Sequence, residues 1–178
     1  MKQQKWKSKS FALLLAIMMI FTMMPQMAFA DDTAAAPQEA GSASSAQHVI
    51  VSTATELAQW GGVDFTGTIE LANDIDMTGV EMKPIKSLNG TFEGNGYTIS
   101  NLELNSAVKV DDYVNATGLI AKLNGTVQNL KMENVQITSN SKSGIYAGAI
   151  VGIATNQGET ARIVNCSVYD GKIAMPED

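Results

Sequence analysis

A six-residue frame recurs in the second half of the chain: apolar, any residue, asparagine, apolar, any residue, apolar. The frame spans residues 99–104, 127–132 and 163–168, and its asparagines are Asn101, Asn129 and Asn165. These asparagines are 28 and 36 residues apart, and a weaker copy places Asn73 another 28 residues before the first. Repeats of about 20 to 50 residues are typical of stacked units. Because the segments are rich in β-branched residues, the spacing predicts a β-solenoid.

Stacking of such units in register determines which side chains point inward. Each strand of a parallel solenoid lies about 4.8 Å from its counterpart one turn away, so equivalent positions carry similar side chains. Alternation along the frame places its apolar residues inward and the intervening residues toward solvent. The predicted structural core residues of the frame are Leu102, Leu104, Leu130, Met132, Cys166 and Val168.

The asparagines of the frame are predicted to form one structural ladder. Asparagine tolerates left-handed backbone angles, and its side-chain amide both donates and accepts hydrogen bonds. We therefore expect Asn101, Asn129 and Asn165 to lie one above another at the same corner of successive coils.

Residues 1–30 have the pattern of a secretory signal peptide. Four lysines precede an apolar run, 11–24, that only Thr22 interrupts, and an Ala-Phe-Ala triplet ends at Ala30. We expect cleavage after this triplet. The alternative is an uncleaved membrane anchor, but the apolar run has 14 residues, whereas a spanning helix needs about 20. Later in the chain the longest stretch without strongly polar groups, 144–154, is also too short, so no transmembrane segment is expected after cleavage.

Small and polar residues dominate 31–47, which is therefore predicted to be a flexible spacer. Folding is expected to begin near His48. Thr53 and Glu56 have the spacing of a capping box, and a glycine pair follows, so a short helix is expected between residues 54 and 60.

Composition excludes several kinds of functional site. One cysteine and one histidine cannot supply an internal disulfide, a four-thiolate zinc site or a Ser-His-Asp triad. Residues 1–30 hold four of the 12 basic residues and none of the 18 acidic ones, which leaves 8 basic against 18 acidic residues. Such a surface repels phosphate backbones, so nucleic acid is not an expected partner. We assign no catalytic, cofactor-binding or metal-binding residues and expect no cofactor.

Two segments, 71–79 and 90–102, resemble the opening coils of bacterial surface proteins that carry GLUG repeats. The stretch Gly-Thr-Phe-x-Gly-Asn-Gly-Tyr-x-Ile, which begins at residue 90, is the most specific part. Residues 118–138 and 147–173 are similar to the repeats themselves. The resemblance covers about residues 49–173, which is nearly all of the chain that is expected to fold.

The GLUG resemblance implies a right-handed parallel β-helix in secreted, often wall-associated or adhesive proteins, and it implies no shared catalytic residues. Ala121 and Ala149 stand where the motif usually has glycine. We therefore predict an all-β fold for residues 48–178, the β-helix domain with GLUG-like repeats. The predicted domain is a short right-handed parallel β-helix (solenoid) of about four coils with a short N-terminal capping helix.

Two carboxylate pairs, Asp74 with Asp76 and Asp111 with Asp112, leave calcium binding or acid-base chemistry on a glycan open. Hydrogen bonding in turns and caps explains the first pair more simply, and this structural reading is favoured. Cys166 occupies an inward position of the frame, so a buried, inert thiol is expected there.

These observations favour a noncatalytic secreted or cell-surface module for adhesion, glycan or matrix interaction, or structural spacing. The alternative is a polysaccharide-active β-helical enzyme, a lyase or hydrolase. An ice-binding solenoid would need regular rows of outward Thr-x-Thr, whereas the β-rich part of the chain after Val63 has this pattern once, at Thr66 and Thr68. The expected location is extracellular or cell-wall associated. Expected partners are an extracellular glycan, a cell-wall or host surface, and a second copy that associates through the exposed C-terminal coil.

Overall fold

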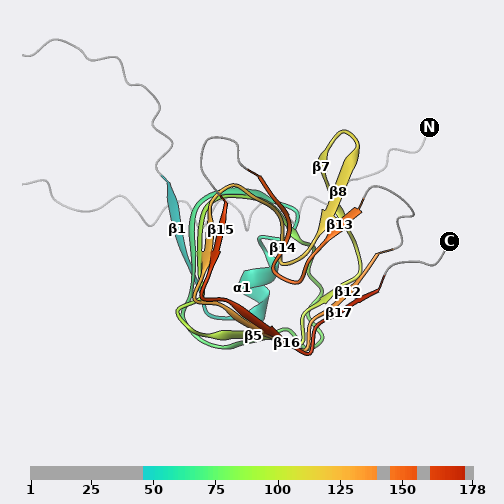
Figure 1. Ribbon diagram of the computed structural model, residues 1–178. Helices are drawn as coiled ribbons and strands as arrows, with labels where there is room; N and C mark the ends of the chain where they lie inside the picture. The colour runs from blue at the N-terminus through green and yellow to red at the C-terminus, as the bar shows by residue number, and fades with distance from the viewer. Residues whose placement is uncertain (1–45, 140–144, 156–160, 175–178) are drawn as a thin grey trace, which may run out of the picture. The chain divides into compact units, whose positions relative to one another are not determined.

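The computed structural model describes residues 46–139, 145–155 and 161–174 (Figure 1). The predicted signal peptide and nearly all of the predicted spacer lie outside the described residues. The first strand begins at Gln47, one residue before the expected start of the folded part.

Within these ranges the fold is all-β apart from one short helix, which confirms the predicted class. The first half contains β1 (Gln47–Val51), α1 (Ala54–Ala58), β2 (Asp64–Leu71), β3 (Ile75–Asp76), β4 (Ile85–Glu93), β5 (Thr98–Ser100), β6 (Glu103–Leu104), β7 (Val108–Asp111) and β8 (Val114–Thr117). The second half contains β9 (Ile120–Leu123), β10 (Thr126–Gln128), β11 (Lys131–Glu133), β12 (Gln136–Thr138), β13 (Ile145–Ala147), β14 (Val151–Ala154), β15 (Arg162–Val164), β16 (Ser167–Tyr169) and β17 (Lys172–Ala174).

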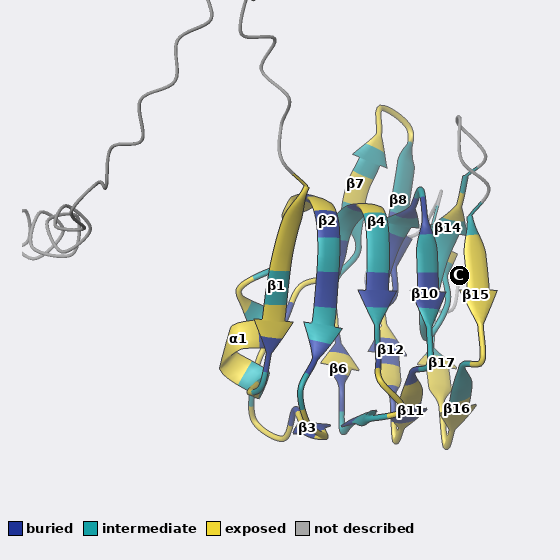
Figure 2. Ribbon diagram, turned by 90° about the vertical axis from the view of Figure 1, so that its left-hand side faces the viewer, coloured by how far each residue is buried: buried dark blue, intermediate teal, exposed yellow. Residues whose placement is uncertain are grey.

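The helix α1 begins at the predicted capping box. The Thr53 side chain accepts a bond from the Glu56 N–H at 3.2 Å, and the Glu56 carboxylate accepts one from the Thr53 N–H at 3.1 Å. Leu57 is fully buried, so the helix covers apolar side chains at the β1 end of the strands (Figures 1 and 2). The ring of Trp60 packs edge-on against Phe65 with ring centroids 5.0 Å apart.

The largest sheet contains the strands β1, β2, β4, β10 and β15 in that order, all paired in parallel (Figure 2). A row of residues crosses it in register: His48, Thr68, Thr91, Thr126 and Arg162. The chain therefore returns to the same row after 20, 23, 35 and 36 residues. We call each of these stretches a circuit. The strands β9 and β14 extend the same sheet from β4.

Two narrower parallel sheets carry the chain onward in the later circuits. One has the order β16-β11-β5-β3 and the other the order β17-β12-β6. A further sheet, β13-β8-β7, contains the one antiparallel pair among the described strands, the hairpin of β7 and β8. This hairpin carries Tyr113, which is 93% exposed.

Apolar side chains of successive circuits meet inside the strands. Leu102, Leu104, Leu130 and Met132 are fully buried, as the alternation of the frame predicts. The other two predicted core residues lie after β15, in the last described part of the chain. Cys166 there is half-buried, and Val168 lies opposite Met132 but is 37% exposed. Val168 is therefore not a buried core residue, because no described strand lies beyond β16 to cover it.

Candidate functional site

Two rows of polar residues mark two successive corners of the later circuits. The first corner row follows β4, β10 and β15 and consists of Asn95, Asn129 and Asn165. The second corner row lies at the ends of β3, β5, β11 and β16 and consists of Asp76, which is the last residue of β3, and of Asn101, Asn134 and Asp170, which directly follow the other three strands. Apart from Asp76, every member has a φ between 50° and 56°. Asparagine and aspartate are the non-glycine residues that adopt this left-handed conformation most readily, which explains their recurrence.

Side-chain bonds run along the first corner row. The Asn165 Nδ2 donates to the Asn129 Oδ1 at 2.8 Å, and the Asn129 Nδ2 donates to the Glu93 Oε1 at 2.9 Å. Glu93 also accepts the Asn95 N–H at 2.8 Å. The Asn95 Nδ2 then donates to the Glu70 Oε1 at 2.8 Å. One direct bond between amides and the carboxylates of Glu93 and Glu70 therefore link the first corner row across the circuits.

Asn101 does not join Asn129 and Asn165. It lies in the second corner row, where its Nδ2 donates to the Asp76 Oδ1 at 2.8 Å and its Oδ1 accepts the Asn134 Nδ2 at 2.7 Å. The prediction of one ladder through all three asparagines is therefore wrong. Its source is the frame itself, which occurs at both corners of one circuit: residues 132–137 repeat the pattern of 127–132.

The hydrogen bonds at the corners lower the pKa values of three carboxyl groups. Bonds from Asn101 and Thr78 hold the pKa of Asp76 below its ordinary value. Bonds from Asn95 and His48 do the same for the pKa of Glu70. Burial raises the pKa of Glu93, but the bonds from Asn129, Gln128 and the Asn95 N–H more than offset it, so the net shift is downward. All three groups therefore favour the ionised form in the folded chain.

The carboxylate pairs of the sequence make turn and strand hydrogen bonds. The Asp74 Oδ1 accepts the Thr98 N–H at 2.8 Å, and Asp76 belongs to the second corner row. The Asp111 Oδ1 accepts the Asp112 N–H at 2.7 Å, and Asp112 lies 3.4 Å from the Lys109 Nζ. Residues 46–139, 145–155 and 161–174 contain no group of three or more His, Cys, Asp or Glu side chains that could hold a metal ion.

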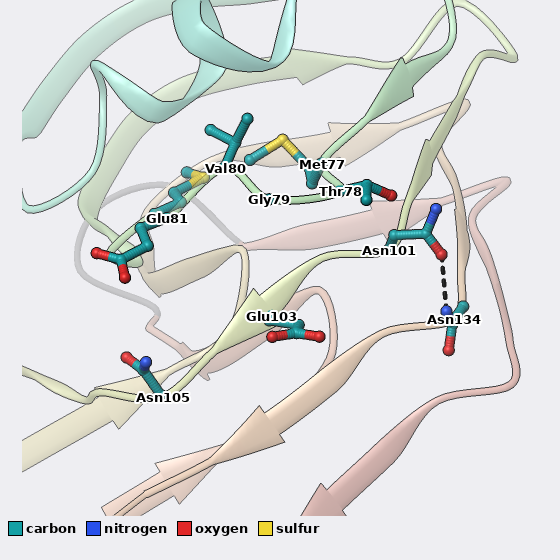
Figure 3. A pocket seen from close by; sticks show the side chains of 10 residues that line it. Met77, Thr78, Gly79, Val80, Glu81, Asn101, Glu103, Asn105 and Asn134 are labelled. Atoms are coloured by element: carbon teal, nitrogen blue, oxygen red, sulfur yellow. Dashed lines mark hydrogen bonds between the residues drawn. The ribbon is translucent and has the colours of Figure 1, made fainter.

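A polar pocket of about 490 Å³ lies beside the second corner row (Figure 3). It is lined by the loop 77–82, by Asn101 and Asn134, and by Glu103 and Asn105 from β6 and the residues after it. The loop is fixed at its start because Asp76 accepts both the N–H and the hydroxyl of Thr78. Met77 and Met82, the first and last residues of the loop, are buried.

Three polar side chains that line this pocket are available to a ligand. Within the described part of the chain, no hydrogen bond or ion pair engages the side chains of Glu81, Glu103 or Asn105. Glu103 and Asn105 lie below the loop that carries Glu81 in Figure 3. Two carboxylates and an amide are suitable acceptors for hydroxyl and ammonium groups. Sequence reasoning missed this pocket, because it depends on how the loop folds against a strand more than twenty residues away.

The chain has partial similarity to one very long protein. It is 34% identical to Halomucin from Haloquadratum walsbyi over 109 residues, which is 60% of this chain and 1% of that protein. The chain thus spans about 1% of the length of the curated relative that it matches. No family model and no solved structure matches the chain. Among the described residues, no helix has the length and apolar character needed to cross a membrane.

Proposed function

We propose that this chain is a secreted or cell-surface module, a short right-handed parallel β-helix that works without catalysis in adhesion, contact with extracellular glycans or matrix, or structural spacing. The observation that carries the proposal is the parallel register from His48 to Arg162 across five strands. Stacked circuits of this kind create an extended repetitive surface. The resemblance of the sequence to GLUG-repeat proteins agrees with this architecture.

Export rests on two further observations. Residues 1–30 have the lysine-rich start, the apolar run and the Ala-Phe-Ala triplet of a cleaved signal peptide. The partial similarity to Halomucin supports a surface or secreted location. Mass spectrometry of secreted protein should therefore find Asp31 at the amino terminus, and a retained Met1 would contradict the proposed cleavage.

The polar pocket is the proposed contact for a saccharide. Glu81, Glu103 and Asn105 present acceptors to hydroxyl groups, and no basic side chain lines the pocket. An uncharged sugar or an amino sugar fits this chemistry, whereas sulfated and uronic acid polymers meet like charge. The acidic balance of the chain after residue 30 acts in the same direction.

A polysaccharide-active enzyme is the second candidate, because Glu81 and Glu103 line the same pocket. Glycosidases act through a pair of carboxyl groups, one as acid and the other as base or nucleophile. The noncatalytic proposal treats the two carboxylates as ligand contacts only.

A glycan array combined with a reducing-sugar assay separates the two candidates. We expect the mature chain to bind neutral or amino glycans and to release no reducing ends. Glu103→Gln should weaken binding, whereas Glu133→Gln, an exposed position on β11 outside the pocket, should not. Release of reducing ends by the wild type, abolished in Glu103→Gln, would establish an enzyme and overturn the proposal.

A further inference from the structure

The last three strands that the structure describes form a layer that no further described strand covers. We define the terminal layer as β15, β16 and β17 with the corner residues Asn165 and Asp170. Its inward side chains Ile163, Val168 and Ile173 are 51%, 37% and 48% exposed. Their counterparts one circuit earlier, Val127, Met132 and Ile137, are all 0% exposed. The terminal layer thus exposes residues whose register positions belong to the core.

The backbone of the terminal layer is also open on one side. Among the described strands, β15 pairs only with β10, β16 only with β11 and β17 only with β12. The outer N–H and C=O groups of three strands are therefore presented together. Such an edge is a template for pairing with another strand.

The opposite end of the stack of circuits, at β1, does not offer a surface that matches the terminal layer. The helix α1 lies there, and Leu57 of the helix is 0% exposed. Val51 of β1 and Leu71 of β2 are also fully buried and Val49 of β1 is half-buried, so the inward side chains at this end are less exposed than those of the terminal layer. Head-to-tail addition of one chain to the next would have to place exposed apolar side chains against this less exposed end. The two ends are therefore not complementary.

We propose that the terminal layers of two copies of this chain stack against each other about a two-fold axis. A second copy presents the same three open edges and the same three inward apolar residues at matching spacing. The two-fold operation reverses the strand direction, so the new pairs are antiparallel and continue the existing sheets across the interface. The terminal layer contains the basic residues Arg162 and Lys172 together with Asp170, so it does not share the acidic excess that would make two copies repel each other. Among its described residues each copy has one such layer, so this contact closes at two copies.

The test is the mass of the mature full chain in solution, measured by light scattering or sedimentation over a range of concentrations. We expect twice the chain mass at high concentration and dissociation on dilution. Ile163→Lys should give a single-chain mass, because it places a charge at an inward position of the interface. Val164→Lys is the matched control, since this neighbour is 40% exposed but occupies the outward side of the same strand, and its mass should stay doubled.

Thermal melting of both variants checks that they fold, and amide hydrogen exchange of the wild type gives an independent readout. Exchange at the outer edges of β15, β16 and β17 should slow as concentration rises, whereas exchange at the edge of β1 should not change. A wild-type chain that stays monomeric at every concentration overturns the proposal. So does a mass that grows without limit, or equal dissociation by Ile163→Lys and Val164→Lys.

Discussion

Replacement of Asn129 by leucine tests how the corner rows stabilise the fold. Asn129 has a φ of 54°, donates to the Glu93 carboxylate at 2.9 Å and accepts from Asn165 at 2.8 Å. Asn165 has a similar φ of 52°, but its side chain bonds only to Asn129 among the described residues. The same substitution at the two positions therefore removes different numbers of bonds from the same backbone conformation.

The expected magnitudes follow from these contacts. A left-handed backbone costs leucine about 1 to 2 kcal/mol. Loss of a bond between amides costs about 0.5 to 1.5 kcal/mol, and loss of a bond to a carboxylate about 1.5 to 3 kcal/mol. Asn129→Leu should destabilise the chain by about 3 to 6.5 kcal/mol and Asn165→Leu by about 1.5 to 3.5 kcal/mol. The difference of about 1.5 to 3 kcal/mol measures the bond from Asn129 to Glu93.

Urea unfolding followed by circular dichroism gives both free energies of unfolding. Asn129→Gly is the control, because glycine keeps the left-handed backbone and removes only the side-chain bonds. Its cost should fall below that of Asn129→Leu. Equal costs for the leucine variants at 129 and 165 would refute the role of Glu93, and a glycine variant as unstable as the leucine variant would refute the backbone contribution.

Three further predictions concern the core, the strand contacts and pH. Leu130→Asp puts an unpaired charge at a fully buried position and should abolish cooperative unfolding. Lys131→Asp, on the exposed side of β11, should cost under about 1 kcal/mol of folding free energy. Similar melting curves for the two variants would contradict the inward and outward assignment. Gly90→Ala should lower the free energy of unfolding by at least about 2 kcal/mol, because the added Cβ would overlap the Gly67 carbonyl oxygen. Gly96→Ala adds a Cβ with nothing near it, so it should lower that free energy less in the same unfolding assay. The pKa of Glu93 lies below its ordinary 4.5, so its contribution is complete above that pH and is lost as pH falls through the folded value. Between about pH 5 and 3 the melting temperature should therefore fall less in Glu93→Gln than in the wild type.

Local patterns in the sequence predict the local parts of this fold. The start of α1 follows from Thr53 and Glu56 alone, because a capping box joins residues three positions apart. The inward direction of Leu102 and Met132 follows from alternation along one strand. Neither inference needs to know which strand lies beside which.

The pairing between circuits could not be predicted, because their lengths vary from 20 to 36 residues. The asparagine frame occurs at two corners of a circuit, so matching Asn101 to Asn129 gave the wrong partner, and the true partner is Asn134. The tight approach of Gly67 and Gly90 was also hidden, since it exists only once the strands lie in register. The same dependence on distant pairing concealed the role of Glu93.

The parallel register across β1, β2, β4, β10 and β15 is the central claim, since the proposed module and the proposed dimer both depend on it. The direct measurement is a pulsed electron spin distance between labels at His48→Cys and Arg162→Cys, in a Cys166→Ser background. Labelled chain should be diluted with unlabelled chain, so that distances between copies do not contribute. Four strand spacings of about 4.8 Å separate these residues, which predicts a single distance of about 15 to 25 Å. A distance beyond about 30 Å, or a broad distribution, would contradict the register of the strands and the account built on it.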